Sequence, residues 1–284
     1  MGYQKYWKLS EKPFEETCNT RFFFESDDHR EALDRMLYVV NDRNMNMGLL
    51  TGEVGCGKTL TKHVFEGSLS KHQFEVISFE NSNFPFLDIL YDILSRMSFR
   101  DARLAISDDS QQLDRHDKYN LMQTFKKRIE TLVYEEKRHC VLIFDEAQQM
   151  APDVIDEVKN LTNIASETQN YLTIFFVGQP ELRDKIRTIR QVDQRIFLRF
   201  HLNTLDYNNT SKYIQHRLRI AGTDNLGLFT SDAVEIIFRS TSGVPREINR
   251  LCKLALSYGF AQGVETIDKD DIEIILEDMR KHDS

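Results

Sequence analysis

Hydrophobic residues follow two different periods along this chain. Short, nearly continuous apolar runs bounded by turn residues are typical of strands buried in a sheet. Such runs predict strands at residues 47–51, 74–79, 140–144, 171–177 and, more weakly, 196–202. Between them, apolar residues spaced three or four apart predict amphipathic helices. These helices are expected before residue 44 and over residues 58–69, 86–97 and 118–136.

The last part of the chain has a different pattern, because after Asp206 the apolar positions are almost wholly at helical spacing. Strands that alternate with helices, followed by helices alone, predict an α/β core with a parallel sheet flanked by helices, and a small helical domain behind it. We expect an N-terminal segment at 1–44 that packs on the core, the α/β core at 45–205 and the helical domain at 206–284. Residues 98–116 mix charge with little periodicity and are expected to form a surface loop.

Composition narrows the class of protein. Hydrophobic residues make up 40% and charged residues 29% of the 284 positions, which is typical of a folded globular protein. The net charge of −8 creates no global positive field that would attract nucleic acid, although a local basic groove is compatible with it. The four cysteines lie far apart without C-x-x-C spacing, so we expect neither a zinc site nor a disulfide framework. No apolar stretch approaches the roughly 18 residues of a membrane span, and we expect a cytoplasmic protein.

A glycine-rich loop follows the first predicted strand and matches the pattern G-x-x-x-x-G-K-S/T. It consists of Gly52, Glu53, Val54, Gly55, Cys56, Gly57, Lys58 and Thr59. The glycines let backbone N–H groups approach phosphate oxygens, and the helix that follows adds the positive end of its dipole. In this pattern the lysine reaches the β- and γ-phosphates and the threonine hydroxyl binds Mg²⁺. A chance glycine-rich turn is the alternative, but the strand before the loop and the helix after it favour an ATP site.

An acidic pair, Asp145 and Glu146, directly follows the apolar run at 140–144. Carboxyl ends of parallel strands face the ligand crevice of an α/β sheet. Asp145 can therefore hold the Mg²⁺ shell, while Glu146 orients and deprotonates the attacking water. The alternative is a helix N-cap aspartate with an incidental glutamate. The 87 residues that separate Lys58 from Asp145 (145 − 58) leave room for the intervening strand and helices, which favours the catalytic interpretation.

These motifs belong to a wider set by which the chain resembles the ExeA/GspA-like AAA+ ATPases. The resemblance covers nearly the whole chain and rests on short runs that are specific only together. Among them are Pro13-Phe14, Arg21 to Phe23, His29 to Leu33, Asp145 to Gln148, Leu161 to Asn163, Gly178 to Leu182, Gln194 to Ile196, His216 to Leu218 and Gly243 to Leu251. The resemblance implies a P-loop AAA+ core with a helical lid, and an ATP hydrolase that assembles into a homo-oligomeric ring or helical filament.

The resemblance also implies roles for three further positions. Gln179 matches a sensor residue that couples the γ-phosphate to the sheet, although it could be a turn residue before a proline. Arg246 matches a second sensor that reaches back to the phosphates, and its position at a helix start is unfavourable for a merely structural cation. Arg195 matches an arginine finger that acts on a neighbouring subunit, with Arg190 and Arg199 as rivals.

The N-terminal aromatic residues Tyr3, Tyr6, Trp7 and Phe14 have two interpretations. They could wall the adenine site, or they could pack the N-terminal segment onto the core. Aromatic side chains mostly serve burial, so we expect packing.

Two cellular roles fit this sequence. Proteins similar to the transposition regulators TnsC and MuB polymerise on double-stranded DNA and recruit a transposase. The alternative is an assembly ATPase of type II secretion or of a type IV pilus, which acts on protein partners. ExeA-type proteins carry a transmembrane helix and a peptidoglycan-binding domain after the ATPase, and we expect neither in this chain. This absence and the chain length favour transposition, whereas the acidic pI near 5.6 favours protein partners.

We expect transposition. The candidate DNA contacts, whose alternative is a solvated surface, are Arg96, Arg100, Arg103, Lys126, Lys127 and Arg128.

Overall fold

The computed structural model describes residues 2–99, 114–167 and 169–282. The chain forms two compact units. The first, which we call the helical unit, contains Met1–Glu31, Glu53–Val64 and Leu202–Ser284. The second, the α/β unit, contains Ala32–Gly52 and Phe65–His201. Most of the expected surface loop at 98–116 falls outside the described residues.

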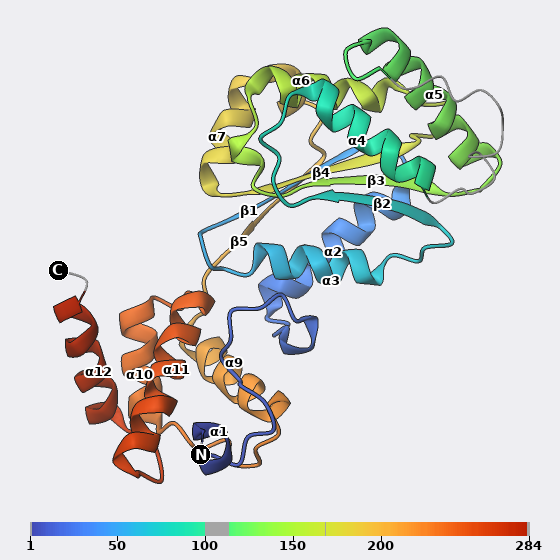
Figure 1. Ribbon diagram of the computed structural model, residues 1–284. Coiled ribbons are helices and arrows are strands. Elements are labelled where there is room, and N and C mark those ends of the chain that lie inside the picture. The colour runs from blue at the N-terminus through green and yellow to red at the C-terminus, as the bar shows by residue number, and fades with distance from the viewer. Residues whose placement is uncertain (1, 100–113, 168, 283–284) are drawn as a thin grey trace. The chain divides into compact units, whose positions relative to one another are not determined.

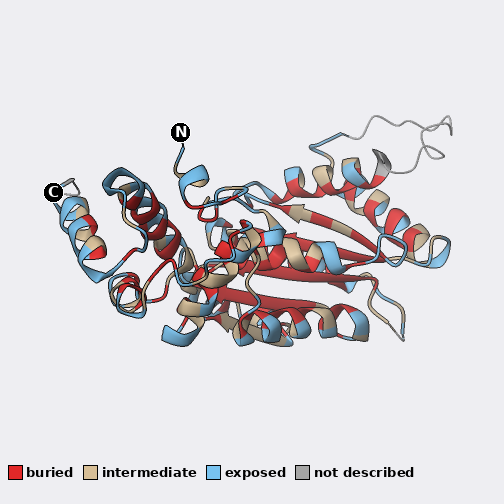
Figure 2. Cartoon of the chain, turned by 90° about the horizontal axis from the view of Figure 1, so that it is seen from below, coloured by how far each residue is buried: buried red, intermediate tan, exposed pale blue. Residues whose placement is uncertain are grey.

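The α/β unit is built on a five-stranded sheet in the order β2-β3-β4-β1-β5. Its strands are β1 (Met47–Gly52), β2 (Phe74–Phe79), β3 (His139–Phe144), β4 (Leu172–Gly178) and β5 (Leu198–Leu202). The pairs β1–β4, β3–β4 and β2–β3 are parallel. Every residue of β1, β3 and β4 is buried, which explains the uninterrupted apolar runs (Figure 2). The predicted parallel α/β fold is therefore confirmed.

Helices cover both faces of this sheet (Figure 1). In the order of the chain they are α2 (Asp27–Asp42), α3 (Lys58–Ser68), α4 (Phe86–Phe99), α5 (Lys118–Tyr134), α6 (Pro152–Asn160), α7 (Pro180–Thr188) and α8 (Arg190–Asp193). Apolar side chains of α4 to α7 pack with those of the sheet in one continuous core. On the opposite face, Phe65 at the end of α3 packs edge-on against Phe175 of β4, with ring centroids 5.2 Å apart. Two 3₁₀ turns, η3 (Ala147–Gln149) and η4 (Leu161–Asn163), follow β3 and α6.

After Asp206, where the sequence predicted helices alone, the helical unit contains four helices. They are α9 (Tyr207–Ile220), α10 (Ser231–Thr241), α11 (Pro245–Gln262) and α12 (Lys269–His282). Their ends carry the expected capping residues: the side chains of Asp206 and Thr230 accept backbone N–H groups at the starts of α9 and α10. Pro245 opens α11, and Gly263 ends it in the left-handed conformation, with φ 72°.

The N-terminal segment completes the core of these four helices. It contributes a short helix α1 (Tyr3–Tyr6), a 3₁₀ turn η1 (Thr20–Phe22) and the buried side chains Trp7 and Phe14. The indole N–H of Trp7 donates to the Leu256 carbonyl over 2.9 Å. Four helices of this length bury little apolar surface alone, so added aromatic side chains stabilise them.

The sequence led us to expect this packing on the α/β core instead. Trp7 and Phe14 belong to the helical core, which favours packing over a role as adenine walls. The boundaries 1–44, 45–205 and 206–284 stay a prediction.

None of the described helices has both the length and the hydropathy that crossing a membrane requires.

Candidate functional site

The glycine-rich loop at residues 52–59, which we call the phosphate loop after its expected role, leaves the sheet at Gly52, the last residue of β1. Its residues 53–59 belong to the helical unit. Gly55 and Gly57 have φ angles of +84° and +98°, which L side chains rarely adopt. A Cβ atom on Gly55 would lie 2.8 Å from the Cβ of Arg246, and one on Gly57 would lie 3.1 Å from Nε2 of His29. Both glycines are therefore required by backbone conformation and by close neighbours.

Two residues of the loop carry the polar groups that a phosphate site needs. Lys58 is buried, and its Nζ donates to the Glu53 carbonyl over 2.8 Å, so the amine curls over the loop. Lys58 also opens α3, and Thr59 lies half-buried in the same first turn. The loop therefore sits at a helix N-terminus, where N–H groups and the dipole attract anions.

His29 supports the loop from the start of α2. Its Nδ1 lies 2.6 Å from Ser26 Oγ, and its Nε2 lies 3.3 Å from the Cys56 carbonyl oxygen. Burial lowers the pKa of His29, which favours the neutral ring. A neutral ring that accepts the Ser26 hydroxyl at Nδ1 carries its proton on Nε2 and donates it to the Cys56 carbonyl. The sequence offered no separate signal for this contact, because it involves residues 27 positions apart.

The start of α11 contacts the same loop from the other direction. The backbone N–H of Arg246 donates to the Gly55 carbonyl over 3.3 Å, and Val244 would contact any Cβ at Gly55. The Arg246 guanidinium is about half exposed, with the Glu16 carboxylate 3.8 Å away. The structure thus places Arg246 beside the loop at residues 52–59, and its role as a second sensor stays a prediction.

The acidic pair lies in the α/β unit, at the carboxyl end of β3. Because β3, β4 and β1 are parallel, β3 ends at the same edge of the sheet at which β1 leads into the phosphate loop. Asp145 is buried, and its Oδ1 accepts the backbone N–H of Glu146 over 2.9 Å. Its backbone is held on both sides, since its N–H donates to Phe79 and its carbonyl accepts the Ser82 hydroxyl.

Two glutamine side chains donate hydrogen bonds to Glu146. Its Oε2 accepts the Gln148 amide over 2.5 Å and the Gln179 amide over 3.3 Å. Glu146 adopts the left-handed conformation, with φ 50°, where β3 turns into η3. The expected base and the expected sensor therefore meet in one cluster. Our sequence reasoning assigned no role to Gln148; its only signal was its place in the run Asp145 to Gln148.

The three candidate arginine fingers differ in their partners. Arg195 Nη1 donates to the Thr162 hydroxyl over 2.7 Å, and Arg199 is held by the carboxylate and carbonyl of Asp193. Arg190 is exposed, and no side-chain partner for it is found among the described residues.

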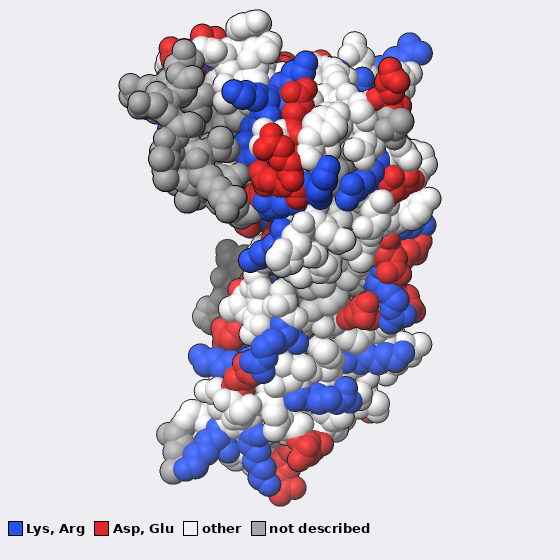
Figure 3. All heavy atoms as spheres, turned by 90° about the vertical axis from the view of Figure 1, so that its right-hand side faces the viewer, with Lys and Arg blue, Asp and Glu red and all other residues white. Residues whose placement is uncertain are grey.

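The candidate DNA contacts that the structure describes, Arg96, Lys126, Lys127 and Arg128, differ in burial and in partners. Arg128 is buried in an ion pair with Glu136, which removes it as a DNA contact. Arg96 pairs with Asp92 at 2.6 Å and stacks over Phe79. Lys126 and Lys127 are exposed on α5, whereas Arg100 and Arg103 lie outside the described residues. On the face drawn in Figure 3, Lys and Arg alternate with Asp and Glu.

The two residues that the sequence analysis assigned to Mg²⁺, Thr59 and Asp145, carry the oxygen donors that this ion prefers. Among the described residues, no cluster of three or more His, Cys, Asp or Glu side chains forms a metal cage. Mg²⁺ does not need one, because it binds one or two protein oxygens and fills its octahedron with phosphate oxygens and water. The Thr59 hydroxyl and the Asp145 carboxylate are oxygen donors of that kind.

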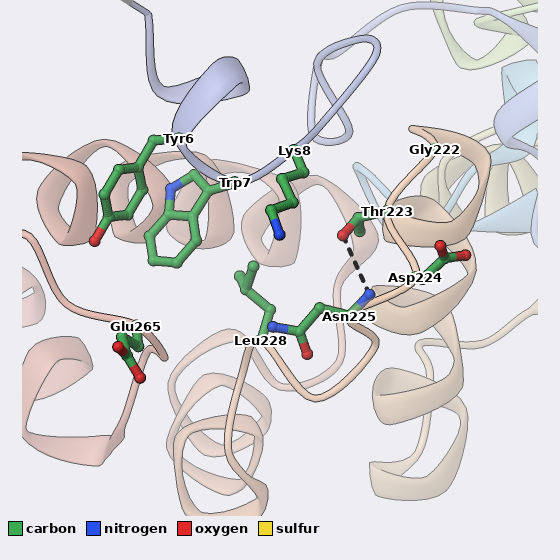
Figure 4. A pocket seen from close by; sticks show the side chains of 9 residues that line it. All are labelled: Tyr6, Trp7, Lys8, Gly222, Thr223, Asp224, Asn225, Leu228 and Glu265. Carbon is green, nitrogen blue, oxygen red and sulfur yellow. Dashed lines mark hydrogen bonds between the residues drawn. The ribbon is translucent and has the colours of Figure 1, made fainter.

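A hollow lies in the helical unit, with a volume of about 470 Å³ (Figure 4). Its lining consists of Tyr6, Trp7, Lys8, Gly222, Thr223, Asp224, Asn225, Leu228 and Glu265. None of these belongs to the phosphate loop or the acidic cluster, and the polar ones among them are mostly exposed.

Known proteins resemble this chain along most of its length. General secretion pathway protein A of Aeromonas hydrophila is 32% identical over 276 residues, which are 96% of this chain and 47% of that protein. The chain thus spans about half the length of this relative. The ORC2 protein of Aeropyrum pernix, solved as ADPNP-ADP complexes, superposes with a TM-score of 0.67 at 14% identity, over 95% of this chain and 71% of that one. The RuvB Holliday junction branch migration motor of Thermotoga maritima gives 0.54 at 16% identity, over 90% and 70%.

At such low identities the two solved structures show a shared fold alone. The family is established by sequence: the AAA domain model matches residues 41–186, just over half of the chain. This chain belongs to the AAA family, and within it the chain resembles General secretion pathway protein A, as its motifs predicted.

Proposed function

We propose that this protein is an ATPase that binds ATP at residues 52–59 and hydrolyses its γ-phosphate. The observation that carries the proposal is the loop itself: two glycines at positive φ lead directly into a helix that opens with Lys58 and Thr59. Such a loop presents backbone N–H groups, an ammonium group and a helix dipole to a triphosphate.

Each named residue has a part in the proposed reaction. Water attacks the γ-phosphorus while the bond to the bridging oxygen of ADP breaks, and the Glu146 carboxylate accepts the proton of that water. Thr59 and Asp145 would hold Mg²⁺, which neutralises charge on the β- and γ-phosphates. Gln179 senses the γ-phosphate, and Arg246 and an arginine finger of a neighbouring subunit stabilise the transferring group. The active form is accordingly a homo-oligomer.

Replacing the loop lysine tests nucleotide binding. We expect Lys58→Ala to weaken ATP binding at least about tenfold, because the variant lacks the ammonium group that would bind the phosphates. Equilibrium binding of a fluorescent ATP analogue measures this, with Lys71→Ala at an exposed position as the matched control. Wild-type protein that binds no nucleotide at all would refute the proposed function.

For the cellular process we propose action on protein partners in a secretion or pilus system. Support comes from the 32% identity with General secretion pathway protein A. No finding supports the transposition role that the sequence led us to expect, and the buried Arg128 and the net charge of −8 both weigh against it. This similarity therefore reverses our preference between the two roles.

Two experiments test the process. First, we expect ATP hydrolysis to be unchanged by duplex DNA at low salt; stimulation that disappears at high salt would return transposition to consideration. Second, a chimera in which this chain replaces the matching half of the Aeromonas protein should restore secretion in cells that lack that protein. The same chimera carrying Lys58→Ala should not. A folded, ATP-hydrolysing chimera that fails to restore secretion would contradict the proposed process.

A further inference from the structure

We propose that Gln148 is a positioning residue that holds the Glu146 carboxylate for catalysis and links it to the sensor Gln179. This inference rests on the proposed ATPase function and deepens it. Both ends of the Gln148 amide are engaged, and its two partners are the residues that the mechanism needs to coordinate.

The orientation of the Gln148 amide is fixed by chemistry. Its Nε2 donates to Glu146 Oε2 over 2.5 Å, and its Oε1 accepts the backbone N–H of Gln179 over 3.2 Å. A carboxylate only accepts and a backbone N–H only donates, so a flipped amide would lose both hydrogen bonds. The side chain therefore bridges the end of β3 and the end of β4 in one orientation.

Neighbouring residues restrict the position of the Gln148 side chain. A Cβ atom on Gly178 would lie 2.4 Å from Gln148 Oε1 and 2.8 Å from Leu182 Cδ2, so a larger residue at 178 would press on the amide and on Leu182. The backbone of Gln148 is also anchored, because the Lys185 ammonium donates to the carbonyls of Gln148 and Met150. Lys185 lies on α7 and Gln179 follows β4. Gln148, in the η3 turn, is therefore hydrogen-bonded to both of these segments.

This arrangement suits a general base. Both amide donors bind the same carboxylate oxygen, Oε2, and among the described residues no donor reaches Oε1 of Glu146. The lone pairs of Oε1 are therefore available to a water molecule, while the two hydrogen bonds fix the position of Oε2. A shift of Gln179 reaches Glu146 by two routes, directly through its own amide and indirectly through Gln148. Gln148 thus couples the position of Gln179 to the position of the Glu146 carboxylate.

The test compares two neighbouring glutamines. Gln148→Met keeps the size of the side chain and removes both hydrogen bonds. Gln149→Met is the matched control, because Gln149 is exposed in the same 3₁₀ turn. We expect Gln148→Met to lower kcat about 10- to 100-fold, as small misplacements of a reacting group do, with KM for ATP and affinity for the ATP analogue changed less than about twofold. Gln149→Met should match the wild type.

A double-mutant cycle separates positioning from general packing. Gly178→Ala should also lower kcat, because the added methyl group displaces the Gln148 amide. If it acts through Gln148, the double variant Gly178→Ala/Gln148→Met will be about as slow as Gln148→Met alone. Additive losses, equal losses in nucleotide affinity or a faster Gln148→Met enzyme would overturn the inference. Wild-type protein is assayed first: no hydrolysis there refutes the proposed function, whereas an active wild type with an equally active Gln148→Met refutes only the role of Gln148.

Discussion

Burial lowers the pKa of two buried histidines in this chain, His29 and His139. His29 supports the phosphate loop, whereas His139 opens β3 and accepts or donates a hydrogen bond with the Thr173 hydroxyl at 2.8 Å. Burial lowers the pKa of His139 from 6.5 to about 4, and the positive charge of Arg43 adds to this effect. The folded chain therefore protonates His139 only at a lower pH than the unfolded chain does.

The first prediction is a loss of stability in the α/β unit between pH 6.5 and pH 4. In this window the unfolded chain binds a proton at His139 that the folded chain does not bind, so the free energy of unfolding decreases as the pH falls. The loss approaches about 3 kcal/mol near pH 4 and is absent above pH 6.5. Hydrogen exchange at the amides of β3 measures it. The fluorescence of Trp7 does not, because the single tryptophan lies in the helical unit.

The control is His139→Gln, which keeps a polar contact with Thr173 and cannot titrate in this range. Its sheet should be less stable at neutral pH but should lose less stability on acidification. If acid weakens the sheet equally in both proteins, His139 is not the group responsible.

At this scale the sequence predicts a role for residues whose chemistry follows from a contiguous run. The loop at 52–59 and the pair Asp145-Glu146 are of this kind, because each motif carries its own spacing. Gln148 and His29 were missed as functional residues because their roles depend on partners 31 and 27 positions away in the sequence. The left-handed conformation of Glu146 was equally hidden, since a turn after a strand depends on its tertiary contacts.

At the scale of elements, the phosphate loop connects the start of α2 with the start of α11. His29 contacts its Cys56 carbonyl, and the N–H of Arg246 contacts its Gly55 carbonyl. The first turn of α11 therefore forms a hydrogen bond with the backbone of the glycine-rich loop, and we expect a change in the loop to alter the start of α11.

The second prediction follows from this contact. Gly55→Ala forces a side chain into the left-handed region, which costs about 1–2 kcal/mol, and drives its Cβ against Arg246 and Val244. We expect the affinity for the ATP analogue to fall at least about tenfold. Faster hydrogen exchange at the first turn of α11 should accompany this loss, because the Arg246 N–H no longer reaches its acceptor.

The matched control is Gly67→Ala, at a helical glycine with no neighbour within 4 Å of the added Cβ. There alanine favours the helix by about 0.5–1 kcal/mol, so binding should be unchanged and stability equal or higher. Tighter packing of α11 in Gly55→Ala would contradict the proposed coupling between loop and lid.

The order of the elements could be predicted from periodicity, and the partners of the N-terminal segment could not. All five strands lie within two residues of their expected bounds, because buried parallel strands leave continuous apolar runs. The apolar residues of the N-terminal segment, Trp7 and Phe14 among them, form no such run. Their sequence shows that they are to be buried but not against which helices, and the helical unit uses them to complete its core.

At the scale of the whole molecule, the chemistry is proposed to require two copies of the chain. Arg195, the finger expected from the resemblance, is held by Thr162 within its own chain, and Arg199 is held by Asp193. Arg190 is exposed at the start of α8 without a side-chain partner among the described residues. Which arginine reaches a neighbour is a property of the assembly, and neither the sequence nor a single chain determines it.

The third prediction uses the assembly to identify the finger. Glu146→Gln should bind ATP and fail to hydrolyse it, since an amide accepts no proton from the attacking water. Arg195→Ala should bind ATP with nearly unchanged affinity as a monomer and lose hydrolysis in the assembly, because the transition-state charge lacks its guanidinium. A mixture of the two inactive proteins should regain activity. At mixed interfaces the intact Arg195 of a Glu146→Gln subunit serves the intact Glu146 of an Arg195→Ala neighbour.

The same mixture made with Arg190→Ala or Arg199→Ala tests the rivals on equal terms. An arginine that acts on its own subunit cannot be supplied by a neighbour, so its variant stays inactive in the mixture. A variant that keeps full activity alone is excluded as the finger. Rescue in only one of the three mixtures identifies the arginine, and rescue in none, with assembly verified by sedimentation, would mean that each subunit hydrolyses ATP without help from its neighbour.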